Sequence, residues 1–225
     1  MILCLETATK NCSVALVDHS GLKGALEERG EKFVHGERLH VLIKDLLSQF
    51  TVLPGQIDAV CVGKGPGSYT GLRIGVSAAK GLCYAWNIPL MSVSTLECFD
   101  FPDTAEGDVV ISVLDARRDE VYAQVWENIS GTLIPLDLVE AVVLNEESWS
   151  KYKDHRLFVI GDCADKVKSL VASNDRWRFL DNSYPSAKQM LRSVQEKSYD
   201  LEDVAYFEPY YLKDFVAEKS KKKWL

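Results

Sequence analysis

The chain has 225 residues, 47% apolar and 26% charged, so it can bury a sizeable core and shows no compositional sign of disorder before its last few residues. Its net charge of −7 and pI near 5.2 argue against a stand-alone nucleic-acid binder, because phosphate contacts need a basic surface. No pair of its six cysteines has the C-x-x-C spacing of a zinc or redox motif, so we expect reduced thiols. No signal peptide precedes the first apolar run, and no apolar run is long enough to cross a membrane. We therefore expect a cytoplasmic protein.

The first hundred residues predict an antiparallel meander followed by alternating helices and strands. Apolar runs separated by turn residues indicate strands at 2–6, 13–17 and 24–29. Apolar residues then recur at helical spacing through 35–50. A strand at 57–62, a helix at 71–86 and a strand at 89–93 follow. This order predicts an α/β fold with a mixed sheet and helices packed on it.

The second half begins after a joint around Phe101-Pro102-Asp103. It predicts strands at 109–114, 120–126 and 156–160 and helices at 186–195 and 201–207. We therefore expect a first lobe over 1–103 and a smaller second lobe over 104–225. The second lobe includes the C-terminal helix and a basic tail at 219–223, which can pack back on the first lobe.

The segment GKGPGSYTGLRIG at 63–75 is the most distinctive stretch of the chain. A P-loop would close with Gly-Lys-Ser/Thr, and that tripeptide is absent from the sequence. A dinucleotide-binding fingerprint would read G-x-G-x-x-G at the opening strand–helix turn, which does not fit here. Backbone amides of 63–68 could still hold an anion at the start of the helix, although nothing in the segment specifies one.

The helix that follows this segment has an unusually wide apolar arc of about 220°. Only Arg73, Ser77, Lys80 and Tyr84 form a polar strip on it, so two partners are needed to cover the rest. One is the sheet, and the other is a second helix of the chain or a second protein. Glycines and alanine at 71, 75 and 79 favour a close contact, either against the sheet or across a protein interface. The interface alternative predicts these contact residues: Leu39, Leu42, Ile43, Leu46, Gly71, Leu72, Ile74, Gly75, Ala78, Ala79 and Leu82.

Several segments in order along the chain resemble the TsaB (YeaZ) family. GPGSYTGLRIG, AAKGL and IPLMSVSTLE resemble its glycine helix and the strand after it, and LETATKNCSVALVD resembles its opening hairpin. HGERLHVLIKDLL resembles its first helix, and LDARRDEVYAQVW and EPYYLK resemble two later signatures. The resemblance runs through the whole chain.

The resemblance implies the ASKHA fold of actin, sugar kinases and Hsp70, with two lobes built on related mixed sheets. It implies a role in making threonylcarbamoyladenosine in tRNA, beside the anticodon, as a non-catalytic dimerisation and scaffold subunit. The implied partners are the catalytic paralogue TsaD and the ATPase TsaE, with tRNA contacted only indirectly or through the complex. When the chain is alone, we expect it to pair with itself through the predicted helices at 35–50 and 71–86. No cofactor is expected.

The resemblance also bears on a metal site. The paralogous transferases carry two histidine ligands after the strand that follows the glycine helix, and Thr95 and Phe99 stand at those positions here. Thr is a poor ligand and Phe is none, and only Glu97 remains between them. The four histidines of the chain do not form another site, so we expect neither a metal nor a catalytic residue.

Nucleotide binding rests on weaker candidates. In ASKHA phosphotransferases a carboxylate at the end of the first strand and a small polar turn hold magnesium and phosphate, which points to Glu6 and Thr7. In the second lobe the matching loop contains Asp115, although an ion pair between Asp115 and Arg117 is the favoured interpretation of that turn. The alternatives to a scaffold subunit are therefore a weak ATPase of the ASKHA class and an inactive glycopeptidase-like homodimer.

Overall fold

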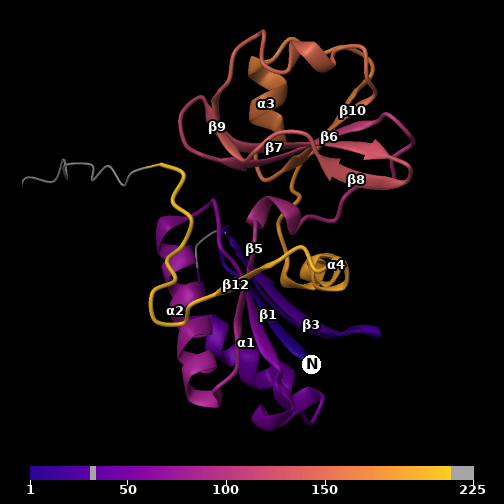
Figure 1. The fold of residues 1–225 in the computed structure, drawn as a ribbon. Coiled ribbons are helices and arrows are strands. Elements are labelled where there is room, and N and C mark those ends of the chain that lie inside the picture. The colour runs from indigo at the N-terminus through magenta and orange to yellow at the C-terminus, as the bar shows by residue number, and fades with distance from the viewer. Residues whose placement is uncertain (31–33, 214–225) are drawn as a thin grey trace, which may run out of the picture.

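The computed structural model describes residues 1–30 and 34–213 and places them in two lobes, each built around a six-stranded mixed sheet (Figure 1). The first sheet has the strand order β12-β5-β4-β1-β2-β3. Its strands are β1 (Ile2–Glu6), β2 (Asn11–Asp18), β3 (Gly21–Arg29), β4 (Ala59–Gly63), β5 (Leu90–Val93) and β12 (Asp200–Glu202). The first three strands are antiparallel, whereas β4 and β5 run parallel to β1, which confirms the predicted meander and mixed sheet.

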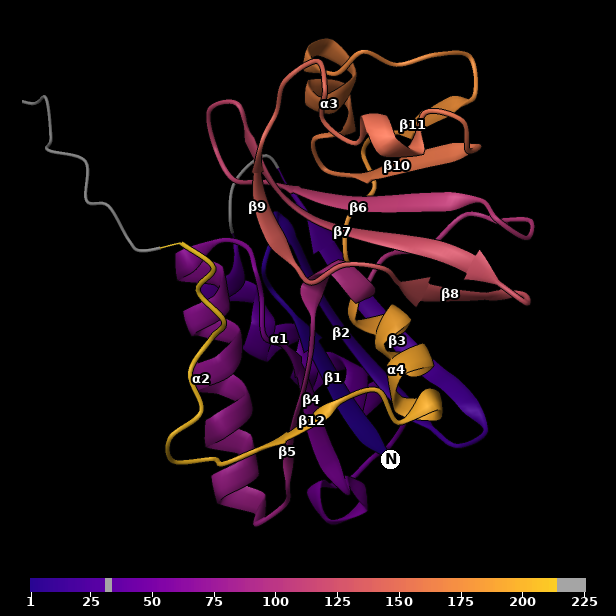
Figure 2. The same ribbon diagram turned by 45° about the horizontal axis from the view of Figure 1, so that its top comes forward.

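Helices cover both faces of the first sheet (Figure 2). The long helices α1 (His35–Gln49) and α2 (Tyr69–Trp86) lie on one face, where they pack on Leu3 and Leu5 of β1. On the other face, α4 (Met190–Glu196) packs on Cys4 of the same strand and on its neighbours. Successive residues of a strand point to opposite faces of the sheet, and both faces of β1 are covered by helices. Its sequence is therefore a continuous apolar run.

The second sheet has the order β11-β10-β6-β7-β8, and β9 pairs with β7. Its strands are β6 (Val109–Asp115), β7 (Glu120–Ile129), β8 (Thr132–Pro135), β9 (Glu140–Val143), β10 (Leu157–Gly161) and β11 (Trp177–Leu180). A short helix, α3 (Ala164–Leu170), packs on one face of this sheet. The opposite face meets the first lobe through Leu96 and Phe99, which are buried against Trp126 and Phe158. None of the described helices is long and apolar enough to cross a bilayer.

The chain returns to the first lobe after β11. The predicted helix at 186–195 is confirmed as a 3-10 turn, Ala187–Gln189, that leads into α4. The helix predicted at 201–207 is wrong, because Asp200–Glu202 pairs with β5 as the edge strand β12. The Asp203 carboxylate then accepts from the amides of Ala205 (2.8 Å) and Tyr206 (3.1 Å), which forms a turn. The division at residue 103 stays a prediction, and the basic tail lies outside the described residues.

The segment 203–213 runs along α2 and covers much of its predicted polar strip (Figure 1). Lys80 Nζ donates to the carbonyl oxygens of Phe207 (2.8 Å) and Ala205 (3.1 Å). Arg73 Nε donates to the hydroxyl of Tyr211 at 3.1 Å. This strip therefore binds the chain's own C-terminal segment, which carries the EPYYLK signature.

Gly71 and Gly75 of α2 face the interior of the first lobe, which corrects their interpretation as clearance for a second protein. A Cβ at Gly71 would overlap the backbone oxygen of Thr7, and one at Gly75 would overlap the Thr7 Oγ1. Thr7 Oγ1 also donates to the carbonyl oxygen of Gly71 at 2.8 Å. The close contact is thus between α2 and the turn after β1, within one chain.

A pair of glycine substitutions in α2 tests this contact. Gly71→Ala should lower the free energy of unfolding by about 1–3 kcal/mol, because the added methyl meets backbone that cannot move aside. Gly81→Ala is the matched control, since nothing lies within 4 Å of a Cβ there and alanine is the better helix former. It should raise stability by up to about 1 kcal/mol. Urea unfolding monitored by circular dichroism measures both, and equal effects would contradict the assigned contact.

Candidate functional site

The carboxylate predicted for phosphate or magnesium binding, Glu6, is fully buried and held by the chain itself. Its Oε1 accepts from the Ala8 amide at 2.6 Å, and its Oε2 accepts from Thr95 Oγ1 at 3.3 Å. A Cβ at Gly63 would overlap Glu6 Oε2, so the backbone of β4 packs directly on the carboxylate. Burial raises the pKa of Glu6 to about 7. Glu6 and Thr7 therefore join β1 to α2 and β4, and they face no open site.

The turn at 63–68 uses part of its backbone hydrogen-bonding capacity internally. The amide of Lys64 donates to Val93 O (2.9 Å), and the amide of Ser68 donates to Ala8 O (2.7 Å). The Ser68 hydroxyl caps α2 by accepting from the Gly71 amide at 3.2 Å. Anion binding at this turn therefore stays a prediction without a structural feature that favours it.

The positions that would carry metal ligands are part of the lobe junction. Thr95 is completely buried and donates to Glu6, and Phe99 is 2% exposed in the apolar contact with the second lobe. Glu97 accepts from the Ser193 hydroxyl at 3.4 Å, and burial raises its pKa. Across residues 1–30 and 34–213, no group of three or more His, Cys, Asp or Glu side chains is arranged to hold a metal ion.

In the second lobe, Asp115 forms an ion pair with Lys166 of α3. The predicted pair with Arg117 is wrong, since Arg117 contributes only its backbone amide, which donates to Asp115 Oδ1 at 3.1 Å. Lys166 Nζ also donates to the carbonyl oxygens of Arg118 (2.9 Å) and Glu120 (2.8 Å). This lysine ties the 115–120 turn to α3.

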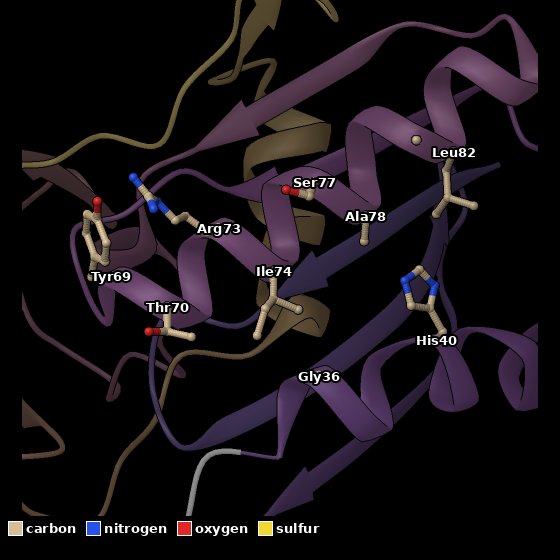
Figure 3. Close-up of a pocket in the computed structure, with 10 residues that line it drawn as sticks. Gly36, His40, Tyr69, Thr70, Arg73, Ile74, Ser77, Ala78 and Leu82 are labelled. Carbon is tan, nitrogen blue, oxygen red and sulfur yellow. The ribbon is translucent and has the colours of Figure 1, made fainter.

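A groove of about 680 Å³ lies between α1 and α2 (Figure 3). Its floor and walls are mostly apolar or small, with Ile74 pointing toward Gly36 and Leu82 toward His40. Arg73 and Tyr69 lie at one end, where the guanidinium stacks 4.1 Å from the centre of the Tyr69 ring. An apolar groove between two helices is a shape that another helix can fill.

Only three of the predicted contact residues line this groove: Ile74, Ala78 and Leu82. The other eight are buried in the first lobe and have little or no surface left for a partner, which corrects the predicted set. They are Leu39, Leu42, Ile43, Leu46, Gly71, Leu72, Gly75 and Ala79. Their apolar stripes face the sheet, because a stripe marks the buried face of a helix whatever covers it.

Seven residues line the groove without having been predicted as contact residues: Gly36, His40, Tyr69, Thr70, Arg73, Ser77 and Gly81. The spacing of four of them was a usable signal. Gly36 and His40 are four residues apart on α1 and share one face, and Ser77 and Gly81 are four apart on α2. Small or mildly polar residues at that spacing, beside an apolar stripe, indicate a face that is neither core nor strongly solvated.

The buried Glu6 carboxyl makes a testable contribution to the pH dependence of stability. In the unfolded chain it loses its proton near 4.5, whereas in the folded protein it keeps the proton up to about 7. Stability should therefore fall by about 3 kcal/mol as pH rises from 4.5 to 7 and level off above that range. Glu6→Gln should lack this component in urea unfolding across the same pH range. Parallel pH profiles for the two proteins would contradict the assigned burial.

Comparison with known proteins extends the resemblance. The family model described as TsaD, tRNA N6-adenosine threonylcarbamoyltransferase, matches residues 32–173. The tRNA threonylcarbamoyladenosine biosynthesis protein TsaB of Haemophilus influenzae is 33% identical over 54% of this chain and 51% of its own length. TsaB of Bacillus subtilis is 35% identical over 76% of this chain and 74% of its own length. The chain thus spans about half the length of the first relative and about three quarters of the second.

A solved structure agrees with these relatives. A Pseudomonas aeruginosa protein, described as uncharacterised and similar to peptidase YeaZ, superposes with a TM-score of 0.78 at 26% identity. The match covers 94% of this chain and 99% of that one. Two lobes built on mixed sheets place the chain in the ASKHA fold class, as the resemblance implied. The extent of these matches shows that the chain belongs to the TsaB (YeaZ) family.

Proposed function

We propose that this protein acts in the threonylcarbamoyladenosine modification of tRNA as a non-catalytic subunit that binds a TsaD-like transferase. The observation that carries the proposal is the groove between α1 and α2, where apolar side chains of α2 lie opposite Gly36 and His40 of α1. A partner helix laid into this groove would bury Ile74, Ala78 and Leu82 in a helical seam.

The hydrogen bonds inside the first lobe favour a non-catalytic role over a catalytic one. The carboxylate, hydroxyl and loop positions that would serve phosphate chemistry are engaged with the chain itself. The weak ATPase alternative would require Glu6 to leave its contacts with Ala8 and Thr95 and the strand β4 to move off the carboxylate. The inactive glycopeptidase-like alternative shares the fold and differs in having no transferase partner.

The same groove would serve self-pairing when the protein is alone. An interface between two copies must be self-complementary, and a groove flanked by two helices from each copy can form a four-helix seam. Binding of the transferase and self-pairing would then exclude each other. The proposal leaves tRNA contacts mainly to the partner, in keeping with the net charge of −7, and includes a TsaE-like ATPase as a further partner in the cytoplasm.

Charge substitutions on α2 test the proposed seam. Leu82→Glu should weaken binding to the organism's own TsaD-like protein by at least about 100-fold, because the seam would bury an unpaired carboxylate. Tyr84→Glu is the matched control, since Tyr84 lies two residues further along the same helix, is 85% exposed and does not line the groove. Titration calorimetry measures both affinities, with circular dichroism to show that each variant is folded.

The proposed seam fails if Leu82→Glu and Tyr84→Glu bind the transferase equally well. Ile74→Glu provides a second variant at the opposite half of the groove, and it should behave as Leu82→Glu does. Gly75→Leu is unsuitable, since a side chain there would collide with Thr7 and alter the fold itself. Analytical ultracentrifugation of the variants alone should show the same loss for the homodimer.

A further inference from the structure

A second cavity, of about 340 Å³, lies on the first lobe at the ends of β2 and β3 that meet the turn after β1. Asn11 and Arg29, which are paired across these two strands, contribute to its lining. The segment leading into α4 contributes Tyr184 and Ser186, and Asp100 comes from the connection between the lobes. Three separate parts of the chain thus converge on one small polar cavity.

Two of the four charged side chains in this cavity neutralise each other. Lys188 Nζ lies 2.9 Å from Glu27 Oε1. Glu27 Oε2 accepts a second hydrogen bond from Asn11 Nδ2 at 3.0 Å. This pair therefore leaves no net charge for a ligand to satisfy.

Arg29 is the cation that remains. Its guanidinium stacks on the Tyr184 ring, 4.8 Å from the ring centre, and one nitrogen donates to the Asn182 carbonyl oxygen at 3.3 Å. Within residues 1–30 and 34–213 it has no carboxylate partner. A guanidinium carries five N–H donors in a fixed plane, so most remain available. The stacked ring and the carbonyl hold that plane in place, which suits it to bind a carboxylate with two parallel hydrogen bonds.

Asp100 is the anion that remains. It is exposed, and in the described part of the chain it forms no ion pair. Asn11 lines the same cavity and adds an acceptor, its amide oxygen, because both hydrogens of its amide nitrogen are used by Glu27 and by the Pro185 carbonyl oxygen (3.0 Å). A carboxylate and an amide oxygen together provide acceptors for an ammonium group.

From this arrangement we propose that the cavity binds a small zwitterion of the free α-amino acid class. The ligand's carboxylate pairs with Arg29, and its ammonium group pairs with Asp100 and the Asn11 amide oxygen. A cavity of 340 Å³ is at the small end of ligand sites and suits a molecule of this size. A nucleoside triphosphate does not fit, because its several negative charges would meet one free cation and two carboxylates. This site is separate from the α1–α2 groove and does not depend on the proposed transferase partner.

The test is titration of the purified full-length chain with L-serine, L-threonine and L-glutamine, followed by calorimetry and by amide chemical shifts. At least one of these should bind, and its carboxamide and N-acetyl derivatives should each bind about ten- to a hundredfold more weakly, because each loses one charge-assisted contact. Arg29→Gln and Asp100→Asn should each weaken binding of the free amino acid by a similar factor.

Matched controls separate the cavity from general charge effects. Arg117→Gln and Asp45→Asn make the same chemical changes at exposed positions outside the cavity and should leave the affinity unchanged. Arg29→Gln should also abolish the preference for the free acid over the carboxamide, which a merely structural role would not do. The proposal is overturned if none of the three amino acids binds, if Arg29→Gln binds as Arg117→Gln does, or if ATP binds in their place.

Discussion

The packing of the turn after β1 against the start of α2 is the constraint on which the rest of the first lobe depends. The Thr7 backbone lies against Gly71, its hydroxyl lies against Gly75, and the same hydroxyl donates to the Gly71 carbonyl oxygen at 2.8 Å. Only glycine at both positions lets the helix come this close. The contact fixes the rotation of α2 about its axis, so Val76, Ala79 and Cys83 face the sheet and Ile74, Ala78 and Leu82 border the groove.

The same packing closes the place where related folds hold phosphate. Gly63 lies on the Glu6 carboxylate, and Thr95 and the Ala8 amide complete its hydrogen bonds. A carboxyl group that is fully buried and keeps its proton up to about pH 7 is suited to joining strands, and poorly suited to binding a hydrated cation. The cavities described on this lobe are at its surface: the groove between α1 and α2, and the small polar cavity beside Arg29.

The sequence predicted the architecture better than the site, for a physical reason. Hydrophobic period distinguishes strands from helices, so the meander, α1, α2 and the three inner strands of the second sheet, β6, β7 and β10, were found. The short exposed strands β8 and β9 have few buried apolar residues and were therefore not predicted. Val204 and Phe207 have a helical spacing, but their segment is a turn held by Asp203. An apolar stripe shows that a face is covered but does not name the cover, which is why Leu39 and Leu46 were assigned to a partner and belong to the core.

The central claim is that α2 turns its glycine face inward and presents its other apolar face to a partner. Hydrogen–deuterium exchange of this chain, with and without the TsaD-like transferase, tests it most directly because it reports every segment at once. The account predicts slower exchange on complex formation in residues 36–40 and 69–82, and unchanged exchange at the β8–β9 edge, residues 132–143. Slower exchange confined to 132–143, with none in α2, would contradict it.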